Sequence, residues 1–129
     1  MKIVYTVAWN PSKDGIIAVG GYGSNQVYLW DALSGTLIKT FGSAKIDNVF
    51  DIAWSPNGER IAVGATNGAT IVETSQYAET LTFSYEEGML TSLAWSPDSS
   101  RIALVGNRDA VQLWDANSGK LLAERYLSR

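Results

Sequence analysis

The sequence predicts an all-β fold built from repeated copies of one unit, each with four short strands. The first observation is the motif Val7–Pro11, which recurs as Ile52–Pro56 and again as Leu93–Pro97. A second motif, Leu29–Ala32, returns as Leu113–Ala116. The third observation is that no stretch combines a 3.6-residue apolar period with helix caps, so no helix is expected. Repetition of this kind indicates one supersecondary unit per repeat.

The first unit, about residues 1–43, is expected to contain strands at about 3–9, 16–20, 26–31 and 36–41. Its third strand includes Val27–Trp30, which is rich in the β-branched and aromatic residues that favour strands. Extra length in this unit falls at Pro11–Gly15, where a surface turn can accommodate it.

The second unit, about residues 44–86, is expected to contain strands at about 48–54, 60–64, 69–73 and 79–83. The apolar run Ile61–Gly64 is bounded by turn residues, as a buried strand should be. Pro56–Gly58 predicts a tight turn before it, because proline fixes φ and glycine adopts positive φ. The third unit, about 87–129, repeats these features, with strands expected at about 90–95, 101–105, 110–114 and 120–126.

The spacing of the repeated tryptophans indicates the family that the sequence resembles. Trp9, Trp54 and Trp95 are 45 and 41 residues apart. With four expected strands per unit and the repeated Leu-Trp-Asp-Ala block, the chain resembles the WD40 β-propeller family over nearly its whole length. The resemblance implies a single repeat domain over 1–129, made of three four-stranded WD40-like propeller blades. All five tryptophans belong to the repeat and are expected to form its structural core: Trp9, Trp30, Trp54, Trp95 and Trp114.

The sequence also departs from the family pattern. It contains no histidine, so the Gly-His dipeptide of the family is missing, and Glu73-Thr74 replaces Trp-Asp in the second unit. The family's usual aspartate is replaced by Ser24, Asn67 and Arg108. The hydrogen-bond network of the family is therefore incomplete, and we expect aromatic packing to supply most of the rigidity.

The number of blades bears on how the fold is completed. Propellers typically have four to eight blades, so three cannot close a ring. Each blade covers its apolar faces against neighbours, which leaves the outer faces of the first and third units exposed. Two completions are open: further repeats of a longer parent chain, or identical copies joined head to tail. Two copies would give six blades and three copies nine, and we favour the homodimer because six lies in the common range.

Composition excludes several classes of function. The chain has 129 residues, no cysteine, no histidine and a net charge of −3. No disulfide, thiolate nucleophile, imidazole base, metal site or cofactor is expected. The acidic balance argues against nucleic acid, and no apolar run is long enough to span a membrane. A cytoplasmic location is the default, although the lack of cysteine fits an oxidising compartment equally well.

Three features that resemble catalytic or phosphate sites have simpler interpretations. Asp47 and Asp51 are four residues apart, but they enter a loop and a sheet face rather than a water-excluded cleft. Gly20–Gly23 lacks the following helix and Lys-Ser/Thr of a phosphate loop, so a turn between strands is favoured. Asp31 and Asp115 are expected to cap the turns toward Ser34 and Ser118. No catalytic residue is assigned.

The register suggests where a partner could bind. Tyr5, Phe50 and Thr91 lie four residues before the repeated tryptophans, a position that in the resembled family opens onto the mouth of the central channel. Ile3, Asn48 and Met89 lie two residues earlier, and Asp47 and Asp51 are nearby. Aromatic side chains beside carboxylates suit a basic peptide or protein. The alternative is that these aromatics only fill space around the axis.

These observations favour a non-enzymatic protein-interaction scaffold that binds peptides or proteins at the channel rim. The alternative is a purely structural ring-building unit, a fragment or engineered part of a propeller, whose only partner is itself. A carboxylate-based enzyme is disfavoured, because no nucleophile has an identifiable activating partner.

Overall fold

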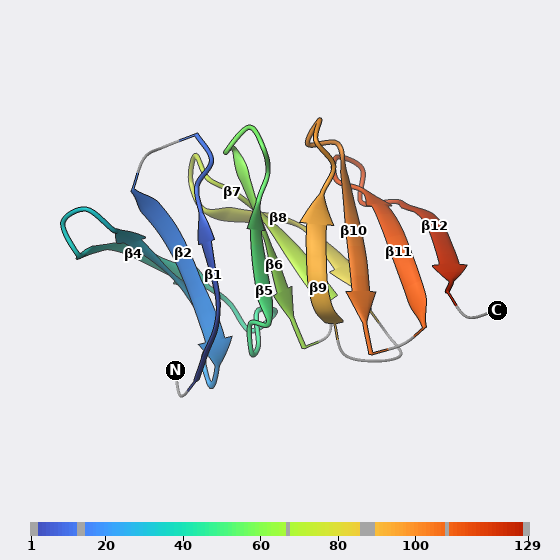
Figure 1. The fold of residues 1–129 in the computed structure, drawn as a ribbon, viewed down its shortest axis with the longest axis horizontal. Helices are drawn as coiled ribbons and strands as arrows, with labels where there is room; N and C mark the ends of the chain where they lie inside the picture. The colour runs from blue at the N-terminus through green and yellow to red at the C-terminus, as the bar shows by residue number, and fades with distance from the viewer. Residues whose placement is uncertain (1–2, 13–14, 67, 86–89, 108, 128–129) are drawn as a thin grey trace.

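Twelve strands form three four-stranded antiparallel sheets in a computed structural model of the chain, which describes residues 3–12, 15–66, 68–85, 90–107 and 109–127. Figure 1 shows the sheets arranged side by side in chain order, from blue to red. Within each sheet the strands follow one another in sequence order. The prediction of an all-β fold with three four-stranded sheets is confirmed.

We call the sheets blades 1, 2 and 3. Blade 1 contains β1 (Ile3–Trp9), β2 (Ile16–Tyr22), β3 (Gln26–Asp31) and β4 (Thr36–Gly42). Blade 2 contains β5 (Asp51–Trp54), β6 (Arg60–Ala65), β7 (Gly68–Glu73) and β8 (Ala78–Ser84). Blade 3 contains β9 (Leu90–Trp95), β10 (Arg101–Gly106), β11 (Ala110–Asp115) and β12 (Leu121–Tyr126). The first strands of the blades, β1, β5 and β9, contact each other in that order.

Turns of the kind expected from the sequence connect the strands. Gly58 has a φ of 75° and donates its N–H to the carbonyl of Ser55. The carboxylate of Asp31 accepts N–H groups of Leu33 and Ser34. The carboxylate of Asp115 accepts those of Asn117 and Ser118 in the same way. Short polar side chains thus fix the turns by bonding to the backbone two and three residues on.

The second inner strand is shorter than the sequence predicts. β5 begins at Asp51 rather than near residue 48, because Asn48 has a φ of 54° and leaves the extended conformation. The N–H groups of Asn48 and Val49 bond to blade 1, at the carbonyls of Ser24 and Gly21. The segment before β5 therefore bonds to blade 1 as well as to blade 2, where the N–H of Phe50 donates to the carbonyl of Gly64.

Two apolar cores lie between the blades. The core between blades 1 and 2 is formed by residues of both sheets and by the buried Ile46 and Val49 of the connecting segment. The core between blades 2 and 3 includes Phe83, Ile71, Leu93 and Ile102. Each blade thus stabilises the next by burying apolar surface against it. Among the described residues, no helix is long and apolar enough to cross a membrane.

Candidate interaction surfaces

A tryptophan on the inner strand joins blade 2 to blade 1, and another joins blade 3 to blade 2. The indole N–H of Trp54 donates to the carbonyl oxygen of Ala8 at 3.1 Å. The indole N–H of Trp95 donates to the carbonyl oxygen of Ala53 at 2.9 Å. Ala8 and Ala53 each stand directly before the tryptophan of their own blade, so the same contact occurs twice at successive blades.

An arginine covers the second of these tryptophans. The guanidinium carbon of Arg60 lies 4.9 Å from the centroid of a ring of Trp95, in cation–π contact. Its two terminal nitrogens donate to the carbonyls of Ala116 at 2.8 Å and Ser99 at 2.6 Å. This one side chain of blade 2 therefore contacts blade 3 at three places, one ring and two carbonyl groups. The sequence carries a signal for this role in its spacing, because Arg60 and Arg101 both stand six residues after a repeated tryptophan.

Each blade has two faces, a leading face and a trailing face, and the strand register shows which residues occupy equivalent positions in the three blades. The leading face carries the inner-strand tryptophan, and in blades 2 and 3 it packs on the preceding blade. The trailing face of blades 1 and 2 packs on the following blade. In the leading faces, the following residues are equivalent by pairing: Val7, Trp9, Ile17, Val19 and Trp30; Ile52, Trp54, Ile61, Val63 and Val72; Leu93, Trp95, Ile102, Leu104 and Trp114. In the trailing faces, the equivalents are Ala8, Ala18 and Leu29; Ala53, Ala62 and Ile71; Ala94, Ala103 and Leu113.

The leading face of blade 1 is open. Trp9 is 63% exposed and Val7 60%, whereas their equivalents Trp54 and Ile52 are 8% and 4% exposed. The difference arises because no described blade lies on that side of blade 1. Four of the tryptophans expected in the repeat core are buried or half-buried, and Trp9 is on the surface.

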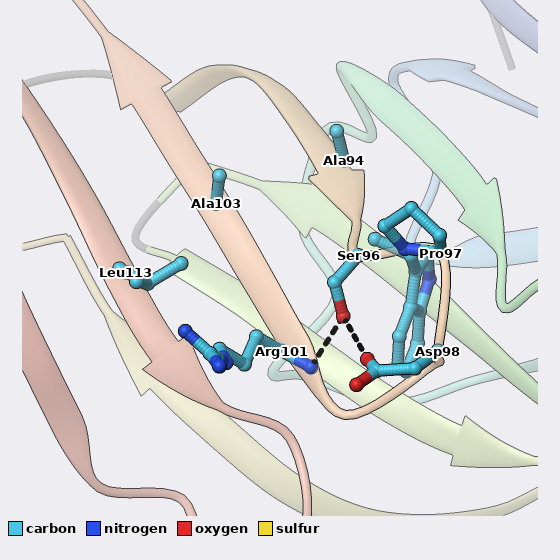
Figure 2. A pocket seen from close by; sticks show the side chains of 8 residues that line it. Ala94, Ser96, Pro97, Asp98, Arg101, Ala103 and Leu113 are labelled. Carbon is cyan, nitrogen blue, oxygen red and sulfur yellow. Dashed lines mark hydrogen bonds between the residues drawn. The ribbon is translucent and has the colours of Figure 1, made fainter.

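The trailing face of blade 3 is open as well and forms a cavity of about 450 Å³. Figure 2 shows that Ala94, Ala103 and Leu113 come from three adjacent strands, with Arg101 beside them. In blades 1 and 2 the equivalent residues cover Trp54 and Trp95, so this cavity is the position that the tryptophan of a following blade would occupy.

Hydrogen bonds fix the turn at one end of this cavity. The hydroxyl of Ser96 donates to Asp98 at 2.7 Å and accepts the backbone N–H of Arg101 at 3.0 Å (Figure 2). Hydrogen bonds from the hydroxyls of Ser100 and Ser96 lower the pKa of Asp98 from its ordinary value of 3.8 to about 2. Asp98 therefore carries its charge under all ordinary conditions.

The residues expected at the channel rim are partly brought together. The rings of Tyr5 and Phe50 have centroids 5.6 Å apart, and Tyr5 is 50% exposed. Ile3 and Thr91 are also exposed, and the Thr91 hydroxyl donates to the carbonyl of Val105 at 3.4 Å. Met89 lies outside the described residues. The structure thus shows an aromatic pair at this position, with Tyr5 exposed and Phe50 partly buried.

The polar residues expected beside the rim have structural contacts. The carboxylate of Asp51 accepts the hydroxyls of Thr6 and Ser92 and the backbone N–H of Leu93, and so links blades 1, 2 and 3. Thr6, Asp51 and Ser92 are equivalent positions, three residues before each tryptophan. The side-chain oxygen of Asn48 accepts the N–H of Gly23 at 2.9 Å. Asp47 is exposed, with its backbone carbonyl bonded to Thr66.

Comparison with known proteins agrees with this architecture. A protein-family model described as "Eukaryotic translation initiation factor eIF2A" matches residues 1–103. The chain belongs to this family. Its curated relatives include WD-repeat proteins, so the three sheets are WD40 blades. The WD repeat-containing protein VIP3 of Arabidopsis thaliana is 33% identical over 107 residues, covering 73% of this chain and 33% of that protein. The WD repeat and HMG-box DNA-binding protein 1 of Mus musculus is 29% identical over 136 residues, covering 99% of this chain and 12% of that protein.

Solved structures show the same fold. The WD40 blades superpose on the RRP9 WD40 repeats with a TM-score of 0.85 and 17% identity, covering 95% of this chain and 38% of that one. They superpose equally well on hydrazine synthase of Kuenenia stuttgartiensis, with a TM-score of 0.85 and 13% identity over 96% of this chain and 36% of that one. At these identities the likeness shows the fold alone. The chain spans between 12% and 33% of the length of the two curated relatives above.

Proposed function

We propose that the chain is a non-enzymatic protein-interaction scaffold whose open trailing face on blade 3 binds a further propeller blade. The observation that carries this proposal is the tryptophan contact, which joins successive blades twice within the chain. The cavity lined by Ala94, Ala103 and Leu113 offers the same surface to a further tryptophan. That blade can come from a second copy of the chain or from further repeats of a longer parent chain.

The apolar composition of the open face supports binding of a protein. Ala103, Val105, Val111 and Leu113 are all only partly covered, and Ala94 is exposed. Contiguous apolar surface of this kind is typical of association sites. Among the described residues, no group of three or more acidic, histidine or cysteine side chains is placed to hold a metal ion, so no metal ligand is assigned to the surface.

Capture by paired baits tests the proposal. The full chain and its Val111→Lys variant are immobilised in parallel, and proteins retained from an extract of the source cells are identified by mass spectrometry. We expect the wild type to retain proteins that contain propeller blades, including this chain itself, and the variant to lose them. The same lysine at exposed Thr82 on β8 serves as the control, since this residue belongs to the outer strand of the middle blade. Equal retention by all three baits would contradict the proposal.

A second candidate function is peptide binding at the channel rim. The observation that favours it is the aromatic pair of the exposed Tyr5 and the partly buried Phe50, with the exposed Asp47 in the segment before Phe50. Aromatic faces beside a carboxylate suit lysine or arginine side chains. A titration with short basic peptides at two salt concentrations tests it, using Phe50→Ala and Asp47→Ala. Binding that both variants weaken, about 1–2 kcal/mol each, supports the rim, and equal binding by all three proteins leaves it as packing.

A further inference from the structure

We infer that the partner of the open trailing face is a second copy of this chain, docked head to tail so that its Trp9 enters the cavity on blade 3. This inference rests on the proposed function and names the occupant of the same surface. Both halves of the contact are present on one chain: the open cavity on blade 3 and the exposed Trp9 on blade 1. Two copies then complete each other's open faces, which gives a six-bladed ring.

The tryptophan contact sets the geometry of docking. Trp54 and Trp95 donate to the carbonyls of Ala8 and Ala53, and Ala94 is the equivalent residue of blade 3. The indole N–H of Trp9 in the second copy would therefore donate to the carbonyl of Ala94. Burial of an indole that is 63% exposed in the single chain would supply apolar stabilisation in addition to this hydrogen bond.

Arg101 is placed to cover the incoming tryptophan. Arg60 pairs with Glu73 in blade 2, and Arg101 pairs with Asp115 in blade 3, so the two arginines occupy equivalent positions. Arg60 lies over Trp95 and donates to the carbonyl of Ala116. Arg101 would lie over Trp9 of the second copy in the same way and donate to the carbonyl of its Ala32, which follows Asp31 as Ala116 follows Asp115. Arg101 is exposed in the single chain, so its guanidinium is accessible to a partner.

Arg125 supplies a second complementary pair. Phe83 of blade 2 pairs with Ala69 and stacks on Trp114 of blade 3, with ring centroids 5.0 Å apart. The residue at the Phe83 position of blade 3 is Arg125, which pairs with Val111, and the residue at the Trp114 position of blade 1 is Trp30. A contact between copies thus replaces an aromatic stack by an arginine over a tryptophan, which is also attractive.

Two one-sided variants test the inference on the full chain. Trp9→Lys disables the leading face and leaves the trailing face intact, and Val111→Lys does the reverse. We expect the wild type to sediment as a dimer at micromolar concentration and each variant alone to sediment as a monomer. An equimolar mixture of the two variants should form a heterodimer, because one intact leading face then meets one intact trailing face. The Thr82→Lys control should remain dimeric.

Several outcomes overturn the inference. A wild type that stays monomeric at all concentrations excludes a second copy as the partner. Blade-containing partners captured through Val111 would then still support the proposed function. A Val111→Lys variant that remains dimeric, or a mixture that forms no heterodimer, excludes head-to-tail docking. Circular dichroism confirms that each variant is folded, and Val7→Lys and Arg101→Glu replace any variant that is not. Removal of the cation–π contact by Arg101→Ala should weaken association about tenfold.

Discussion

The indole N–H of Trp95 lies 2.9 Å from the carbonyl oxygen of Ala53, and this hydrogen bond joins the inner strands of two neighbouring blades. The indole therefore does two things at once: it fills the core between the blades and fixes how far apart the strands lie. Because the partner is a backbone oxygen, the contact depends on the position of a residue and not on its side chain. The same contact can thus recur at every blade that carries the tryptophan.

Substitution of Trp54 by alanine should cost far more stability than substitution of Trp9. Trp54 is 8% exposed and bonded to Ala8, so its removal empties a large aromatic site and should lower the free energy of unfolding by about 3–5 kcal/mol. Trp9→Ala should cost less than about 1 kcal/mol when association is blocked by Val111→Lys, since its indole is then exposed. Urea unfolding of both variants in the Val111→Lys background measures the difference. Similar costs at the two positions would contradict this account of the blades.

Arg60 should contribute to stability through its hydrogen bonds more than through its charge. Arg60→Ala removes two bonds to the carbonyls of Ala116 and Ser99 as well as the contact with Trp95, and should destabilise the chain by about 2 kcal/mol. Arg60→Lys keeps the positive charge but cannot reach two carbonyls with a planar fork, so it should restore only part of this loss. Arg101→Ala in the Val111→Lys background is the matched control and should have almost no effect. Full rescue by lysine would show that the hydrogen bonds are unimportant.

The positions of the strands could be predicted because the signals that set them are local. Short apolar runs, β-branched residues and turns such as Pro56–Gly58 act over a few neighbouring residues. The start of β5 could not be found in this way. Ile46 and Val49 are apolar and resemble the beginning of a strand, but they are buried between blades 1 and 2, and the N–H of Val49 bonds to Gly21.

The roles of Asp51 and Arg60 depend on neighbouring blades, which the sequence does not place in space. The position of Asp51 near Trp54 predicts only that it lies beside the rim. Its carboxylate also accepts bonds from Thr6 and Ser92, whose equivalence becomes visible only when the inner strands lie side by side. The repeated tryptophans, in contrast, could be recognised from their spacing alone, although Trp9 is exposed because no blade among the described residues covers it.

Replacement of Asp51 should lower the stability of the fold. Asp51→Ala removes an acceptor from the N–H of Leu93 and from two hydroxyls in adjoining blades, and we expect a loss of about 1–3 kcal/mol. Asp51→Asn retains one acceptor oxygen and should lose less. Urea unfolding of both variants checks this order, with Asp47→Ala as the control because its side chain is exposed. Wild-type stability in Asp51→Ala would show that the contacts across the blades are not needed.

Acid should weaken blade 3 through Asp98. The hydroxyls of Ser100 and Ser96 lower the pKa of this carboxylate from 3.8 to about 2 in the folded chain, so the folded state prefers the charged form more strongly than the unfolded state does. The resulting stabilisation is present above the unfolded pKa, near pH 4, and is lost as the pH falls through the folded pKa. Unfolding by urea at a series of pH values between about 5.5 and 2 should therefore show decreasing stability in the wild type and a shallower decrease in Asp98→Asn. In Ser100→Ala, which removes the first donor, an NMR titration of the Asp98 carboxyl carbon should show a higher pKa. Parallel pH profiles for the wild type and Asp98→Asn, or an unchanged pKa in Ser100→Ala, would mean that these hydrogen bonds do not hold the turn.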